Sequence, residues 1–175
     1  MNRALTDKCC MVCGIPLDAE YFDVSGFAGD GIAVDKFLDF GLQLPGPLPR
    51  RGEHVVLASF QLHPQYCGVL TYFAQYTDLY AKENEQILTP GFAWGIEQNG
   101  KPVFPYTRFE LIVNPWGYNC LPIAVRLEEN ARVEFVLSNR GVSDAKLASY
   151  PIRAFAGRIM GRYWYNDSFG GRVRS

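Results

Sequence analysis

Apolar and polar residues alternate along the chain from Phe92 to Asn139, in short segments separated by Gly, Pro and Asn. Val133, Phe135 and Leu137 stand at every second position, and a period of two places such residues on one face of a β-strand. No segment of helical length interrupts this region. We therefore expect successive antiparallel strands with a polar outer face, packed on a second sheet.

Turn residues divide this region at three places. Asn99-Gly100 lies between the strand segments Phe92–Ile96 and Lys101–Phe104, and this dipeptide suits the positive φ angles of a type I′ hairpin turn. Asn114–Gly117 and Glu128–Asn130 are the two other predicted turns. The strands that they bound are Arg108–Val113 and Ile123–Leu127.

Two further strands are predicted upstream. In the first, His54–Leu62, alternation places Val56, Ala58, Phe60 and Leu62 on one face. The second, Val69–Thr77, is rich in β-branched and aromatic residues on both faces, as in a covered strand. The charged segment Asp78–Gln86 is either a short helix or a polar loop.

The C-terminal part adds a loop at Arg140–Ser149 and one or two strands within Ile152–Tyr165. Seven or eight strands at intervals of roughly ten residues predict an all-β antiparallel sandwich or jelly roll for residues 51–175. In the last strand, one face receives Ile159, Gly161, Tyr163 and Tyr165, and the other face receives Arg158, Met160, Arg162 and Trp164.

The first fifty residues differ from the rest. Their glycines and the Leu44–Pro49 stretch disfavour both a helix and a central strand. We expect residues 1–50 to form an extended arm or long docking loop. Such an arm needs contacts that offset its entropy, and aromatic residues such as Phe22, Phe27 and Phe37 are candidates to dock on the domain or on a neighbouring protein.

Composition agrees with one folded β-domain. Hydrophobic residues make up 48% of the chain and aromatic residues 14%, with 17 Gly and 11 Pro, a balance that favours strands joined by tight turns. The formal net charge of -1 supplies no field that would recruit nucleic acid or an anionic membrane. Apolar runs are too short to cross a bilayer, and the start lacks the apolar core of a secretory signal. We expect a protein that is made in a cytoplasm and kept or assembled there.

The sequence contains few residues with the spacing of a reaction site. Cys10 and Cys13 are spaced like half of a zinc knuckle, but no second ligand pair follows. His54 and His63 are the only histidines, and they lack the close pair and carboxylate of a metal-binding cupin. No Gly-x-Ser-x-Gly elbow occurs. We therefore expect no catalytic residue, no cofactor and no metal, although a triad assembled in space stays open.

Arginine and tryptophan on one predicted strand face suggest a binding surface instead. Arg158, Arg162 and Trp164 combine large contact areas with polar groups, as do the residues that dominate protein interfaces. The alternative is that Trp164 belongs to the core and that the arginines are solvated. A carbohydrate-binding sandwich is also open, with Trp94, Trp116 and Trp164 as candidate stacking residues.

Residues Pro90 to Tyr165 resemble small virion proteins of tailed bacteriophages, especially jelly-roll decoration or cement proteins. The resemblance is one of pattern and covers under half of the chain. The elements that carry it are Trp94–Gly100, Asn114–Gly117, Pro122-Ile123, Arg132–Leu137 and Arg158–Tyr165.

This resemblance implies a non-enzymatic virion protein that binds and stabilises an assembled capsid, with the major capsid protein or other virion proteins as partners. It also implies a homo-oligomer, often a dimer or trimer, assembled in the host cytoplasm. A head–tail connector, a collar protein and a tail protein are the other virion components that fit. The interface residues expected are Phe22, Phe27, Phe37, Arg158, Arg162 and Trp164.

Overall fold

The computed structural model describes residues 14–29, 48–77, 91–109, 120–148 and 154–166. Within these ranges the chain forms eight strands and one short helix, α4 (Asp144–Ala148). The strands are β1 (Glu20–Gly29), β2 (His54–Gln61), β3 (Tyr66–Thr77), β4 (Phe92–Gln98), β5 (Lys101–Pro102), β6 (Cys120–Leu127), β7 (Arg132–Asn139) and β8 (Ala154–Tyr165).

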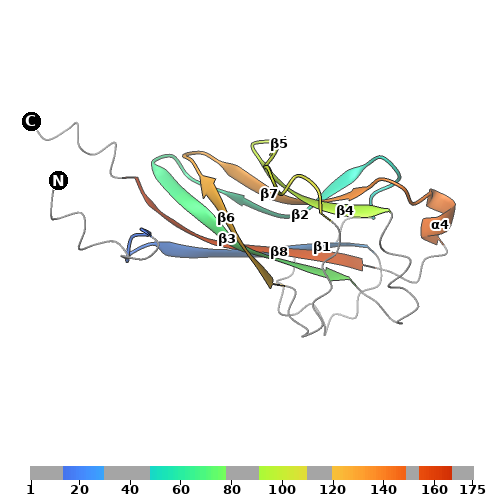
Figure 1. The fold of residues 1–175 in the computed structure, drawn as a ribbon, viewed down its shortest axis with the longest axis horizontal. Coiled ribbons are helices and arrows are strands. Elements are labelled where there is room, and N and C mark those ends of the chain that lie inside the picture. The colour runs from blue at the N-terminus through green and yellow to red at the C-terminus, as the bar shows by residue number, and fades with distance from the viewer. Residues whose placement is uncertain (1–13, 30–47, 78–90, 110–119, 149–153, 167–175) are drawn as a thin grey trace, which may run out of the picture.

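The strands form two four-stranded antiparallel sheets that lie face to face (Figure 1). One sheet has the order β1-β8-β3-β6 and the other the order β2-β7-β4-β5. The first strand therefore pairs with the last, the second with the seventh, the third with the sixth and the fourth with the fifth. A long hairpin wrapped across two sheets gives this pairing, which is the topology of a jelly roll. The predicted all-β sandwich is confirmed.

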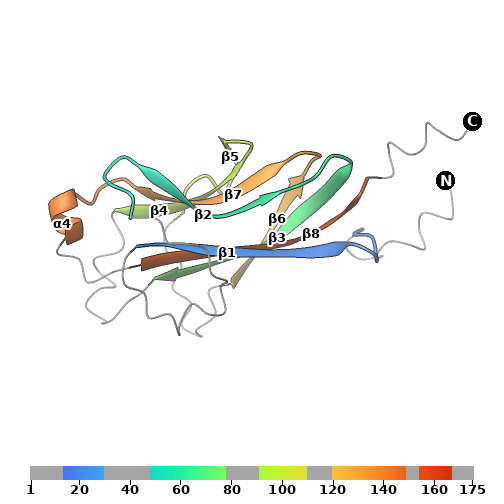
Figure 2. The ribbon, with the colours of Figure 1, turned by 180° about the vertical axis from the view of Figure 1, so that it is seen from behind.

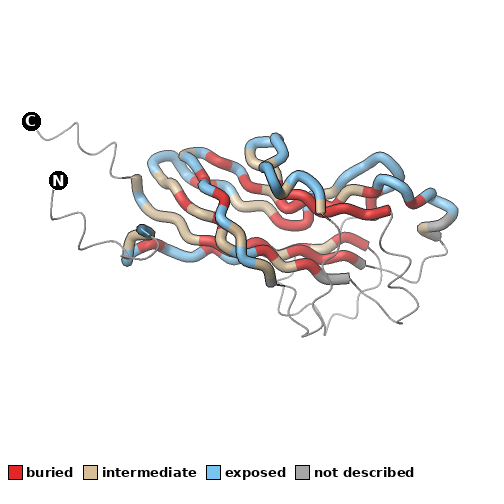
Figure 3. The backbone as a smooth tube through the Cα atoms, viewed as in Figure 1, coloured by how far each residue is buried: buried red, intermediate tan, exposed pale blue. Residues whose placement is uncertain are grey.

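Buried residues, red in Figure 3, lie along the strands of both sheets and form the core between them. Trp94, Phe135 and Phe155 are among the largest fully buried side chains, and Trp94 and Phe155 meet edge to face. A second aromatic series links the sheets near the start of β1. It runs through Phe22, Phe60, Tyr163, Tyr66 and Tyr165.

The predicted turn chemistry is confirmed at two of the three turns. Asn99 and Gly100 have φ angles of 54° and 72°, as a type I′ turn requires, and they join β4 to β5. Asn130 also has a positive φ, and the backbone N–H of Ala131 donates to the Glu128 carbonyl at 3.0 Å. The third predicted turn, Asn114–Gly117, lies outside the described residues.

Strand β2 departs from simple alternation. Its register with β7 shifts between Val56 and Ala58, and a shift of this kind adds one residue and reverses the faces that follow. Leu57 and Ala58 are both buried, whereas Val56 is 39% exposed. The prediction that Val56 shares a face with Ala58, Phe60 and Leu62 is therefore wrong for Val56 and correct for the residues after the bulge.

The N-terminal region also requires a correction. Glu20–Gly29, which we expected within an arm over residues 1–50, forms strand β1 and pairs with β8 over ten consecutive positions. Phe22, Ala28 and the partly buried Val24 pack against the core. The glycines and aromatic residues of this segment therefore belong to an edge strand of the sheet. The sandwich begins well before residue 51. Residues 30–47, including Phe37, lie outside the described residues.

Two smaller expectations concern the connections. The predicted loop at Arg140–Ser149 contains the five-residue helix α4, whose backbone starts with a bond from the Leu147 N–H to the Ser143 carbonyl. Segment Asp78–Gln86 lies outside the described residues, as does most of Arg108–Val113. Arg108 and Phe109 are described, and Phe109 exchanges two backbone hydrogen bonds with Trp94 of β4.

Among the described residues, no helix has the length and apolar character needed to span a bilayer.

Candidate binding face

The side of the β1-β8-β3-β6 sheet that points away from the second sheet is the candidate site, and we call it the outer face. Strand β8 determines its character, because its residues from Phe155 to Trp164 alternate between the two faces of the sheet. Phe155, Ile159 and the glycines 157 and 161 point inward and are buried. Arg158, Met160, Arg162 and Trp164 point outward and are half-buried.

Cross-strand register places the outward residues in rows that run across the sheet. Each row takes one residue from β1, β8, β3 and β6 in that order. The first row is Tyr21, Arg162, Val69 and Arg126, the second is Asp23, Met160, Tyr72 and Pro122, and a shorter row pairs Trp164 of β8 with Cys67 of β3. The outer face is thus a surface of aromatic, aliphatic and arginine side chains.

Both β8 arginines are held in place by β1. The Arg158 guanidinium donates to both carboxylate oxygens of Asp23, with Nε at 2.6 Å from Oδ1. The Arg162 guanidinium lies over the Tyr21 ring, 4.7 Å from its centroid, and donates to the Ala19 carbonyl at 3.1 Å. A cation over an aromatic ring is stabilised by the ring quadrupole, so β1 orients Arg162 without neutralising its charge.

Two adjoining hollows open on the outer face. One, of about 570 Å³, is lined by Trp164, Cys67, Val69 and Arg126 and by Gly14 and Ile15 ahead of β1. The other, of about 540 Å³, is lined by Tyr21, Tyr72, Pro122, Met160 and Arg162. Thr71 and Ile123 line both hollows, so the two form one continuous depression along β3.

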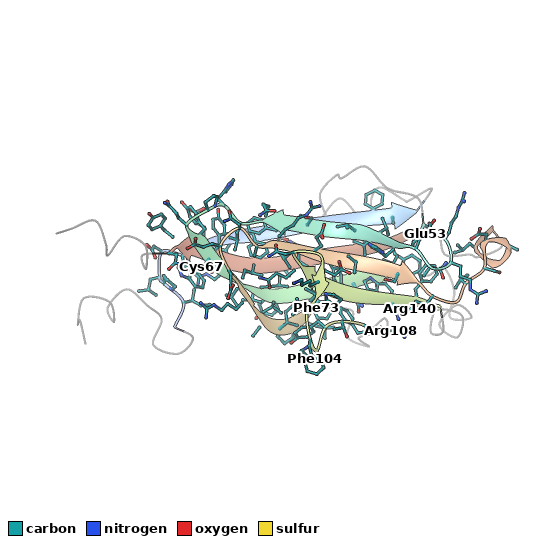
Figure 4. The ribbon with its side chains drawn as sticks, turned by 90° about the horizontal axis from the view of Figure 1, so that it is seen from above. Glu53, Cys67, Phe73, Phe104, Arg108 and Arg140 are labelled. Carbon is teal, nitrogen blue, oxygen red and sulfur yellow. The ribbon has the colours of Figure 1, made fainter. Side chains whose placement is uncertain are left out.

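Cys67 is a free thiol at one end of this depression, and Figure 4 shows it near one end of the sandwich. Partial burial raises the pKa of the Cys67 thiol above its ordinary value, while the positive charge of Arg126 acts in the opposite direction. Glu129 raises this pKa further. The thiol is therefore protonated at neutral pH and contributes apolar surface to the hollow.

Four of the six predicted interface residues lie on the outer face, three of them on β8. Arg158, Arg162 and Trp164 share the outer face of β8. Phe27 is half-buried on β1, whose alternation places it on the same face. Phe22 is a correction: it is 5% exposed and stacks on Phe60 between the sheets, with ring centroids 4.1 Å apart.

Sequence reasoning overlooked the contribution of β1, β3 and β6. Tyr21 is 76% exposed and Tyr72 is 45% exposed, and both stand in the rows beside the β8 residues. The sequence did contain an indication that Tyr72 lies on a binding surface, because Val69–Thr77 is apolar on both faces. Within the described residues, only one of these faces packs on the second sheet. Nothing in the sequence indicated that Arg126 belongs to this surface, since only the register of β6 on β3 places it level with Val69.

The remaining candidate residues do not gather at one place. His54 and His63 are both exposed at the two ends of β2. Trp94 is buried at 1% exposure and cannot stack on a sugar, while Trp116, Cys10 and Cys13 lie outside the described residues. Within the described ranges, no group of three or more His, Cys, Asp or Glu side chains is arranged to hold a metal ion.

No protein-family model and no curated protein matches this sequence.

Proposed function

We propose that this chain is a non-enzymatic virion structural protein that binds an assembled phage capsid through its outer face and stabilises it. The observation that carries the proposal is the outer face itself, on which three paired strands, β1, β8 and β3, present Tyr21, Tyr72, Met160, Arg162 and Trp164. Tyr, Trp, Met and Arg are the residue types enriched where protein interfaces are buried.

The outer face is suited to binding because its polar groups are already in place. Asp23 holds Arg158, and Tyr21 with the Ala19 carbonyl holds Arg162. Side chains that are ordered before association lose less entropy when they bind. A rigid sheet beneath them keeps their spacing constant, as a partner with a regular surface requires.

The breadth of the face favours a protein surface over a small ligand. Its two hollows adjoin and share Thr71 and Ile123 in their lining, so the apolar surface that they offer extends across several strands, as is usual at protein interfaces. The jelly-roll topology is shared by viral capsid proteins and by lectins, so the fold alone does not distinguish a virion protein from a carbohydrate-binding one. The choice of the capsid rests on the resemblance over Pro90 to Tyr165.

The test is to purify particles from the strain that carries the gene and to quantify this chain in them by mass spectrometry. We expect many copies per particle, in the head fraction after heads and tails are separated. Absence from particles would contradict the proposal, and presence only in the tail or neck fraction would replace decoration by a tail, collar or connector role.

The interface is then tested by adding purified variants back to particles that lack the chain. Tyr72→Lys with Met160→Lys should abolish co-sedimentation, because two charges would be buried without partners. Phe104→Lys is the matched control. Phe104 is 87% exposed and extends from the β4–β5 side of the second sheet (Figure 4), so its variant should bind like the wild type.

A carbohydrate-binding module is the second candidate, favoured by the half-buried Trp164 in the wall of a hollow. Aromatic side chains beside polar groups are suited to stacking against sugar rings. A glycan array that shows selective binding, lost in Trp164→Ala and retained in Phe104→Ala, would support this candidate and count against the capsid proposal.

A further inference from the structure

Two arginines of the outer face flank a single apolar residue. Arg162 of β8 and Arg126 of β6 both stand level with Val69 of β3. Neighbouring strands are about 4.8 Å apart, so the two arginine Cα atoms are separated by roughly 10 Å across the sheet. Long guanidinium side chains can reach a common group over this distance.

Neither of these arginines forms an ion pair with a carboxylate of the described residues. Arg158, four residues earlier on the same face of β8, differs because it forms an ion pair with Asp23. Among the described residues, the partners of Arg162 are a tyrosine ring and one carbonyl, and its Nε is buried without a hydrogen-bond acceptor. A buried donor without an acceptor carries a desolvation penalty that a ligand acceptor would remove.

The surroundings of these two arginines are apolar. Arg126 lines one hollow and Arg162 the other, and Thr71 and Ile123 line both. Charge-assisted hydrogen bonds strengthen when apolar groups exclude water from them. A ligand that fits must therefore carry negative charge in the middle and apolar groups on either side.

We infer that the outer face accepts an acidic, otherwise apolar protein segment, whose carboxylate is bound by Arg162 and Arg126 while its apolar neighbours fill the two hollows. This inference rests on the proposed function, since it names the chemistry of the partner at that interface. A nucleic acid or another dense polyanion is disfavoured, because Arg158 is neutralised and the chain has a formal net charge of -1.

The experiment is a selection of random dodecapeptides on the immobilised full-length protein. We expect the selected peptides to contain Asp or Glu flanked by aliphatic or aromatic residues. Their affinity should fall by about tenfold or more in Arg162→Gln and in Arg126→Gln, which remove charge-assisted hydrogen bonds. Arg140→Gln is the matched control and should retain binding, because Arg140 is exposed and follows β7 of the other sheet.

Arg126 is exposed, so Arg126→Gln keeps the test valid even if the half-buried Arg162 is needed for folding. Failure to enrich acidic peptides, or binding that both glutamine variants retain, would overturn the inference. So would displacement of the peptides by a sulfated glycan at equal affinity. Failure of the proposed function looks different: the Tyr72→Lys and Met160→Lys protein would still co-sediment with particles, or particles would lack the chain.

Discussion

Glycine at 161 allows β8 to lie close to its neighbours. A Cβ atom built on Gly161 would stand 2.3 Å from the Val69 carbonyl oxygen and 2.5 Å from Cε1 of Phe22. The first neighbour is backbone and cannot move without changing the pairing of β3 with β8. Glycine at this position therefore allows the Phe22 ring and strand β3 to pack closely against β8, next to Arg162.

We predict that Gly161→Ala lowers the free energy of unfolding by about 1–3 kcal/mol, because overpacking of a filled interior has this cost. Urea denaturation followed by tryptophan fluorescence measures the effect. Ser25→Ala, a small change on the outer side of the neighbouring strand, is the control and should stay within about 0.5 kcal/mol of the wild type. Equal stability of the two variants would show that β8 has room at position 161.

The second prediction at this scale concerns the Cys67 thiol. Because burial raises its pKa in the folded state, iodoacetamide should alkylate Cys67 more slowly in the native protein than in urea, between about pH 7 and pH 10. The same raised pKa favours folding below the ordinary thiol pKa, and this contribution is lost as the pH rises through the folded value. Peptide mass spectrometry after timed labelling measures the rate at this residue.

Charged neighbours give this measurement its controls. Arg126→Gln removes a charge that lowers the pKa of Cys67, so it should slow the labelling further. Glu129→Gln removes a charge that raises the pKa and should accelerate it. Opposite responses would contradict the assignment of these two charges.

Strand β1 is the element whose role changed most between sequence and structure. It supplies Phe22 to the core, Tyr21 and Asp23 to the outer face, and the edge of a sheet. The partners of these three residues all come from later strands. Deleting β1 would therefore remove Phe22 from the core and, at the same time, the residues that hold Arg158 and Arg162 in place.

We predict that deletion of residues 1–29 abolishes cooperative thermal unfolding, since β8 would become an unpaired edge beside an exposed core. Circular dichroism on heating and binding of a hydrophobic dye measure the loss. Deletion of residues 1–13 is the control, as it retains β1 and every described contact, and it should unfold cooperatively. A cooperative transition in the longer deletion would contradict this prediction. It would mean that the sandwich folds without β1, as expected if residues 1–50 were an arm.

The elements were predictable where local chemistry decides the structure. Asn99-Gly100 specifies its turn, and Val133, Phe135 and Leu137 follow one unbroken period. Prediction failed where a distant partner decides the outcome. Pairing with β7 creates the bulge near Leu57, and pairing with β8 makes a strand of Glu20–Gly29. Likewise, the position of Trp164 on β8 was predictable, but its neighbours Cys67 and Arg126 depend on register across three strands.

At the scale of the molecule, the described residues present a broad surface of arginine and aromatic side chains on the β1-β8-β3-β6 sheet. Residues of these types are also enriched at interfaces between copies of one chain. We therefore predict by sedimentation velocity a mass of two or three times the 19.7 kDa chain, as the dimer or trimer implied by the resemblance requires. Tyr72→Lys with Met160→Lys should lower the mass only if the outer face joins the copies.

A monomer at all concentrations would contradict the oligomer proposal and leave the outer face entirely to the partner. If the variant keeps the wild-type mass, the copies associate through another surface. Phe104→Lys controls for the loss of an exposed aromatic elsewhere on the molecule.

Glu20 of β1 pairs with Tyr163 of β8, so the first strand begins and the last strand ends at the same end of the sandwich. Gly14 and Trp164, at that end, also line a hollow of the outer face. Helix α4 lies at the opposite end (Figures 1 and 2). A foreign peptide is thus better inserted at the exposed Ser143-Asp144 than beside Gly14 or Asn166, where it would stand next to the outer face.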